Sequence, residues 1–95
     1  MEVTTWRAAT LGVRIGGPNR DRYFSKAWRS VTVRIDGVPH EFPLSDTFWT
    51  TCPEIRGRGI PAWLRRHGLD TWPKGQPHRL QLVPLGGNCF ELKLL

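Results

Sequence analysis

Residues 29–44 read Arg-Ser-Val-Thr-Val-Arg-Ile-Asp-Gly-Val-Pro-His-Glu-Phe-Pro-Leu, and this stretch predicts a β-hairpin. Its first half alternates apolar and polar residues, which is the period-two pattern of a half-buried strand. Asp-Gly is a two-residue turn whose backbone twist matches that of paired strands. The turn sets a register that pairs Ile35 with Val38, Val33 with His40 and Val31 with Phe42. The inner face of the second strand is then expected to carry Val38, His40, Phe42 and Leu44.

The two prolines of this hairpin indicate where its second strand lies in the sheet. In the predicted register, the nitrogen atoms of Pro39 and Pro43 point away from the first strand, so no hydrogen bond inside the hairpin is lost. Proline donates no hydrogen bond to a further strand on that side. The second strand is therefore expected at a sheet edge, where residues Val38 to Leu44 could also pair with another copy of the chain in a homodimer.

Outward from the hairpin, further elements are expected on both sides. Leu11, Val13 and Ile15 alternate in a strand that ends at the Gly-Gly-Pro-Asn of residues 16–19, and residues 20–27 are expected to form a loop. A short helix begins after Ser45 as its cap, and a second spans residues 60–68 with Pro61 in its first turn and Gly68 at its end. Two strands at residues 79–85 and 89–95 close the chain around Gly-Gly-Asn.

These elements predict one domain over residues 1–95 that is mainly β (α+β). The expected architecture is a small antiparallel barrel or curled sheet of about five to six strands with one or two short helices. Ninety-five residues suffice for one modest core, and a hydrophobic content of 39% is enough for a folded chain.

The charge balance suggests the kind of partner. The sequence has 14 Lys and Arg residues against 8 acidic ones, a net charge of +6, and most of the cations are arginines. Arginine makes forked contacts to phosphates and stacks on rings. Five tryptophans are more than a small core is expected to hide, so some should lie on a contact surface. This composition favours nucleic acid, with duplex DNA first, although an Arg-rich composition can also serve solubility alone.

Other classes of function have weaker signals. Cys52 and Cys89 form no metal-ligand pattern and are expected to be free, mostly buried thiols in a reducing cytoplasm, with a disulfide between them as the alternative. The sequence begins without a signal-peptide pattern and has no apolar run of membrane-spanning length, which again favours the cytoplasm. We predict no cofactor, no metal site and no catalytic residue; a nuclease with His67 or His78 as its base is the enzyme alternative.

The candidate binding residues lie mainly between Cys52 and Pro77. There, cations surround a short helix and two glycine-containing loops, with tryptophans among them. The structural alternatives are a solvated surface loop at residues 56–59 and a Trp72 that plugs the bottom of the barrel. The predicted nucleic-acid-binding set is Arg56, Arg58, Trp63, Arg65, Arg66, Trp72, Lys74 and Arg79. The functional alternative is a protein-interaction or inhibitor module, of the kind found in phages and mobile elements, that binds an acidic partner through the same residues.

The order of short motifs in residues 44–95 resembles a known family. The sequence has Leu-Ser-Asp at residues 44–46, then Arg56 and Arg58, Ile-Pro at residues 60–61, a short helix, and a final hairpin around Gly86-Gly87 that ends in Phe-Glu-Leu-Lys-Leu. It is similar to the plant auxin-response-type DNA-binding pseudobarrel, which also serves as the recognition domain of some bacterial restriction enzymes. The family has spacer residues between Leu and Ser and further strands after this segment. The resemblance implies that residues 1–43 supply those strands, and that Arg56 and Arg58 lie on an arm that enters the major groove of duplex DNA.

Overall fold

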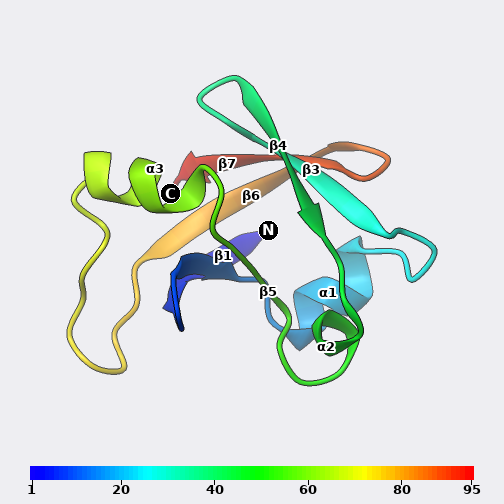
Figure 1. The fold of residues 1–95 in the computed structure, drawn as a ribbon, viewed down its shortest axis with the longest axis horizontal. Coiled ribbons are helices and arrows are strands. Elements are labelled where there is room, and N and C mark those ends of the chain that lie inside the picture. The colour runs from blue at the N-terminus through cyan, green and yellow to red at the C-terminus, as the bar shows by residue number, and fades with distance from the viewer.

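The computed structural model describes all residues, 1–95, and is built around one curled seven-stranded sheet (Figure 1). The strand order is β4-β3-β7-β6-β1-β2-β5, and every neighbouring pair is antiparallel except β3 with β7. The strands are β1 (Glu2–Arg7), β2 (Leu11–Arg14), β3 (Ser30–Ile35), β4 (Val38–Pro43), β5 (Glu54–Arg56), β6 (Arg79–Gly86) and β7 (Cys89–Leu94).

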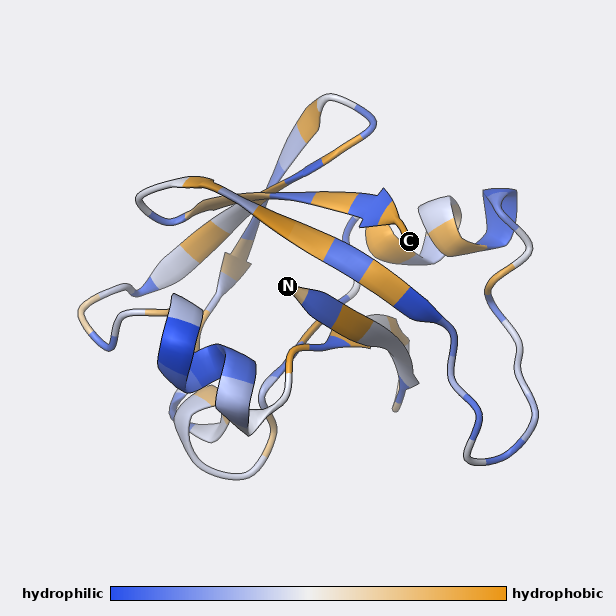
Figure 2. Ribbon diagram, turned by 180° about the vertical axis from the view of Figure 1, so that it is seen from behind, coloured by the Kyte–Doolittle hydropathy of each residue, from blue (hydrophilic) through white to orange (hydrophobic).

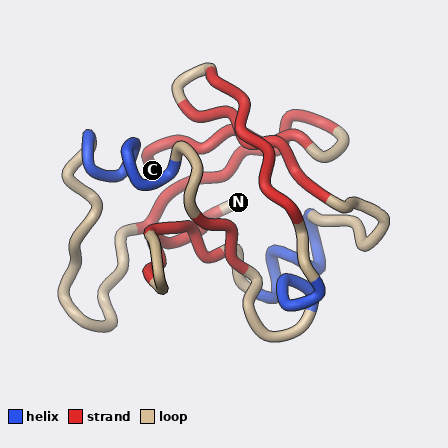
Figure 3. The backbone as a smooth tube through the Cα atoms, viewed as in Figure 1, coloured by secondary structure: helices blue, strands red, loops and turns tan.

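Three short helices complete a mainly β, barrel-like fold, which confirms the predicted fold class with more strands than expected. They are α1 (Gly17–Tyr23), α2 (Asp46–Trp49) and α3 (Ile60–Arg66). The sheet curls into a nearly closed barrel whose two edge strands are β4 and β5 (Figure 3). We call the opening between these two edges the seam.

The predicted hairpin is present with the predicted register. Ile35 lies opposite Val38, Val33 opposite His40, and Val31 opposite Phe42. Asp36 and Gly37 have φ angles of 51° and 78°, the left-handed pair that a tight hairpin turn of this kind requires. The expected inner face of β4 was wrong in part: Phe42 is buried, but Val38 is 54% exposed, because it lies beside the turn at the end of the sheet.

Strand β4 forms an edge of the sheet, as its prolines predicted. The pairing places residues 39, 41 and 43 with their backbone polar groups away from β3. Two of these three residues are prolines, so Glu41 supplies the single backbone donor along this edge. A strand from a second copy would find few donors here, and the homodimer through this edge stays a prediction.

The core fills the barrel with the inward residues of the strands. Leu80 and Leu82 from β6 and Phe90 and Leu92 from β7 are all buried, and Figure 2 shows hydrophobic and hydrophilic residues alternating along these two strands. Trp63 of α3 is also part of the core, together with Ile60 and Leu64. These three residues have the i, i+3, i+4 spacing of a buried helix face.

Helix α3 ends as the sequence predicted. Gly68 has a φ of 67°, and the Leu69 N–H donates to the Leu64 carbonyl at 2.8 Å, which closes the helix in the expected C-terminal motif. Arg66 pairs with Asp36 in the β3–β4 turn. The other end of α3 lies beside β4, since a Cβ on Gly59 would come within 2.6 Å of His40 Nε2. Helix α3 therefore extends along the β3–β4 hairpin.

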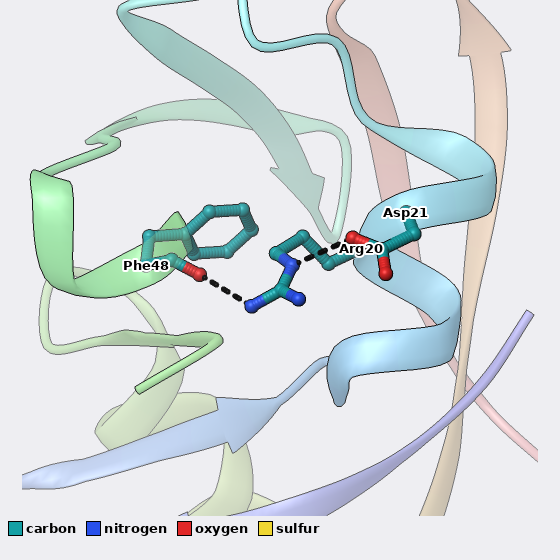
Figure 4. A network of polar contacts seen from close by, with 3 residues as sticks. All are labelled: Arg20, Asp21 and Phe48. Atoms are coloured by element: carbon teal, nitrogen blue, oxygen red, sulfur yellow. Dashed lines mark hydrogen bonds and ion pairs between the residues drawn. The ribbon is translucent and has the colours of Figure 1, made fainter. Parts of the chain in front are cut away.

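Two expectations for the connecting segments were wrong. Residues 20–23, expected in a loop, continue helix α1, which begins with Pro18 in its first turn. Helix α2 forms where predicted, but the Ser45 hydroxyl contacts the Thr47 hydroxyl at 2.8 Å and caps no backbone group. Figure 4 shows the link between these helices: Arg20 donates to the Phe48 carbonyl at 3.3 Å and to the Asp21 carboxylate at 3.0 Å.

Candidate nucleic-acid interface

The outer face of β1, β2 and β5 carries an aromatic ring beside a guanidinium group. Val3 and Thr5 are buried, so the alternate residues of β1, including Trp6, point to the outside. Trp6 lies opposite Gly12 of β2, and Gly12 lies opposite Arg56 of β5. The guanidinium carbon of Arg56 is 5.8 Å from the centroid of the Trp6 ring, a distance at which a cation interacts with the ring.

Two hollows adjoin Trp6. We call the first the Trp72 cleft: it has a volume of about 480 Å³ and is lined by Thr4, Trp6, Arg7, Arg14, Thr71 and Trp72 among others. The second, the seam groove, has a volume of about 470 Å³ and lies between the edge strands; its lining includes Trp6, Phe42, Phe48, Glu54, Arg56 and Arg58. Trp6 lines both, so the two hollows adjoin at this residue.

The Trp72 cleft is built by the long connection between α3 and β6, which Figure 3 shows as the most extended loop of the fold. His78 ties this loop to itself and to β1: its Nε2 lies 2.8 Å from the Thr71 carbonyl, and its backbone N–H donates to Thr5 Oγ1 at 2.9 Å. The Arg7 guanidinium donates to the Asp70 carbonyl at 2.6 Å and lies 5.8 Å from the Trp72 ring centroid. The cleft thus pairs a second arginine with a second indole.

The seam groove has an apolar floor and a charged rim. Phe42 and Phe48 are 2% exposed, and α2, which carries Phe48, is held in place by Arg20. Glu54 is the single carboxylate that lines either hollow; its Oε2 atom is buried and has no hydrogen-bond partner. Arg58 at the rim has a φ of 55°, a left-handed conformation that is costly for a residue other than glycine.

The structure brings three of the predicted binding residues to this surface. Arg56 and Arg58 line the seam groove, and Trp72 lines the Trp72 cleft. Lys74 is exposed in the loop beside Gly75, which also lines the Trp72 cleft. Arg79 lies opposite Thr4 of β1 and is 3.8 Å from the Glu2 carboxylate.

The remaining three predicted residues belong to α3. Trp63 was wrongly expected at a contact surface: it is 3% exposed and packs edge-on against the His67 ring, so its faces cannot stack on a base. Arg65 is exposed at the end of the helix. Arg66 is also exposed, and the carboxylate of Asp36 partly neutralises its charge.

Four charged or indole residues of the surface were missed from the sequence: Trp6, Arg7, Arg14 and Glu54. Neither β1 nor the three-residue β5, which carries Glu54, was expected as a strand. The usable signal was the alternation in residues 3–7, where Val3 and Thr5 face inward and Trp6 faces outward.

The cysteines and histidines occupy separate segments of the fold. Both cysteines are free, and Cys52 is exposed in the seam groove, which corrects the expectation that both thiols are mostly buried. His67 packs on Trp63, and His78 holds the loop described above. The structure contains no group of three His, Cys, Asp or Glu residues placed to hold a metal ion.

Comparison with known proteins assigns no family. No protein-family model, no curated protein and no solved structure matches this chain. The helices of the fold are all too short or too polar to cross a lipid bilayer.

Proposed function

We propose that this chain is a nucleic-acid-binding module that uses the surface formed by the Trp72 cleft and the seam groove, which adjoin at Trp6. The observation that carries the proposal is the composition of that surface. Four guanidinium groups line it, those of Arg7, Arg14, Arg56 and Arg58, with a single carboxylate among them. None of the four arginines forms an ion pair with an acidic residue, so their charges are available to phosphates.

The two indoles support the same ligand. Trp6 and Trp72 are half-buried at the surface, and nucleic-acid-binding grooves combine cations along the backbone with aromatic rings against the bases. Arg58 keeps a costly backbone conformation at the rim of the groove, and such conformations are concentrated at functional sites. The resemblance to the DNA-binding pseudobarrel assigns Arg56 and Arg58 to DNA, and both belong to this surface.

The test is binding of fluorescein-labelled DNA, as a 20-base-pair duplex and as its single strands, from 50 to 200 mM NaCl. Four phosphate contacts predict that affinity falls by roughly 100-fold over this range. Arg14→Ala should weaken binding, and the slope of log affinity against log salt concentration should become shallower by about 1. The matched control is Arg22→Ala, at an exposed arginine of α1 that lines neither hollow. It should leave the affinity and its salt dependence unchanged. Absence of binding to duplex and single strands at 50 mM NaCl would refute the proposal.

An acidic protein is the second candidate ligand. In the free chain, the rings of Trp6 and Trp72 each have an arginine over them, and Trp-Arg clusters are frequent energetic centres of protein interfaces. Capture from a lysate with and without nuclease separates the two ligands. A protein partner that survives nuclease treatment and is lost with Arg14→Ala supports this alternative.

A further inference from the structure

We infer that the seam groove binds a single unpaired guanine base, with Glu54 as the residue that recognises it. This inference rests on the proposed function and specifies what the groove takes from a nucleic-acid strand. Glu54 is half-buried, and its carboxylate makes no hydrogen bond and no ion pair within the chain.

The position of Glu54 makes its isolation notable. It lies on β5 directly opposite Arg14 of β2, yet the two side chains form no ion pair. A carboxylate oxygen that is covered from water and accepts no hydrogen bond destabilises the fold, because it has lost its hydration and gained no replacement for it. A ligand that brings its own donors to this carboxylate would remove that cost.

The surroundings of Glu54 select the kind of donor. Arg56 and Arg58 line the same groove, so its charged side chains sum to one negative and two positive groups. A cationic ligand such as a lysine or arginine side chain is repelled by the two guanidinium groups. A neutral donor attached to an anion fits better, and a nucleotide is such a molecule: its base is neutral and its phosphate is negative.

Hydrogen-bond geometry then favours guanine among the bases. A carboxylate is an acceptor with two adjacent oxygens. The Watson–Crick edge of guanine presents two adjacent donors, N1–H and N2–H, whereas adenine, cytosine and thymine each present one donor with acceptors beside it. This edge is free only when the base is unpaired, which is how proteins read single strands and flipped bases.

The groove also has the size and lining for a base. Its volume of about 470 Å³ falls in the range of small-molecule sites. Phe42 and Phe48 supply the apolar floor, and Trp6 stands where the groove joins the Trp72 cleft. A strand in that cleft could therefore place one base in the groove while its backbone stays beside Arg7 and Arg14.

The experiment compares 5′-GMP with 5′-IMP, 5′-AMP and 5′-CMP as competitors of a labelled, guanine-containing 15-mer. IMP lacks only the N2 amino group, and loss of one hydrogen bond to a charged acceptor predicts at least about tenfold weaker competition. Glu54→Gln should abolish the difference between GMP and IMP. The matched control is Glu91→Gln, at a half-buried glutamate on β7 outside the groove. It should preserve the difference between GMP and IMP.

Three further measurements separate the possible failures. Oligo(dT) that binds with the expected salt dependence, together with equal competition by GMP and IMP, overturns the guanine inference and leaves the proposed function standing. No binding of any oligonucleotide overturns both. Stronger competition by a short arginine-containing peptide than by GMP also overturns the inference. Urea denaturation of Glu54→Gln is expected to show a fold at least as stable as the wild type, so a lost preference is not a sign of unfolding.

Discussion

Arg56 reaches Trp6 across the full width of an intervening strand. The two residues lie on β5 and β1, about 10 Å apart at strand spacing, and the guanidinium carbon is nevertheless 5.8 Å from the ring centroid. The residue between them is Gly12, which has no side chain to separate the guanidinium from the indole. The central contact of the candidate interface therefore depends on a glycine.

Replacement of that glycine should damage the sheet. A Cβ on residue 12 would lie 2.8 Å from Arg56 Cβ and collide with the Ile55 carbonyl, so β5 would have to move. We expect Gly12→Ala to lower the free energy of unfolding by about 1–3 kcal/mol, measured by urea denaturation. Gly17→Ala is the control: its Cβ would meet a single atom at 3.6 Å, and stability should change little. Equal stability of the two variants would contradict the close approach of β2 and β5.

Arg58 should show a conflict between stability and binding. Its φ of 55° is relieved by glycine but not by alanine. We expect Arg58→Gly to be more stable than Arg58→Ala by about 1 kcal/mol, because a Cβ is costly in the left-handed conformation. Both variants should bind DNA more weakly than the wild type, because both remove the guanidinium. Weaker folding of the glycine variant would show that residue 58 does not occupy this conformation in solution.

Trp63 and Trp6 should respond differently to truncation. Trp63 is sealed in the core, so Trp63→Ala is expected to cost about 3–5 kcal/mol in unfolding free energy. Trp6 is half-buried on the outer face, so Trp6→Ala should cost clearly less while it weakens DNA binding. Chemical denaturation and DNA titration of the two variants check both statements. The reverse order of stabilities would contradict the assignment of Trp63 to the core.

The prolines of β4 should protect the chain from self-association. Pro39→Thr with Pro43→Thr adds two backbone donors to an edge that has one. We expect this double variant to form concentration-dependent dimers or aggregates, as unprotected edge strands do. Sedimentation velocity over a range of concentrations measures the effect. Pro73→Thr, in the loop between α3 and β6, is the control and should sediment like the wild type.

Local signals explain which parts of the fold could be predicted. The β3–β4 hairpin was predicted to the residue because the Asp-Gly turn and the alternation act over a few neighbours. The end of α3 followed from Gly68 for the same reason. Helix α1 was missed because its charged sequence has no buried residue to give it a periodic apolar face.

The candidate site was predictable only in part, because it depends on contacts between distant segments. Arg56 and Arg58 were found from their local composition. Trp6 and Arg14 join them through the pairing of β1 with β2 and of β2 with β5, and neither pairing has a local sequence signal. Trp63 was misplaced because nearby cations suggested exposure, whereas the i, i+3, i+4 spacing with Ile60 and Leu64 indicated burial.

The strand order also has a consequence for how the chain acquires its shape. Val3 of β1 is opposite Leu80 of β6, and Val33 of β3 is opposite Phe90 of β7, so the middle of the sheet joins strands that are far apart in the sequence. During synthesis, β1 has no partner on this side until the residues of β6 have left the ribosome. Such non-local topologies fold on the millisecond-to-second scale. The growing chain therefore leaves one edge of β1 unpaired, and the inward apolar residues of β1 and β2 uncovered, while the residues between β2 and β6 are being added.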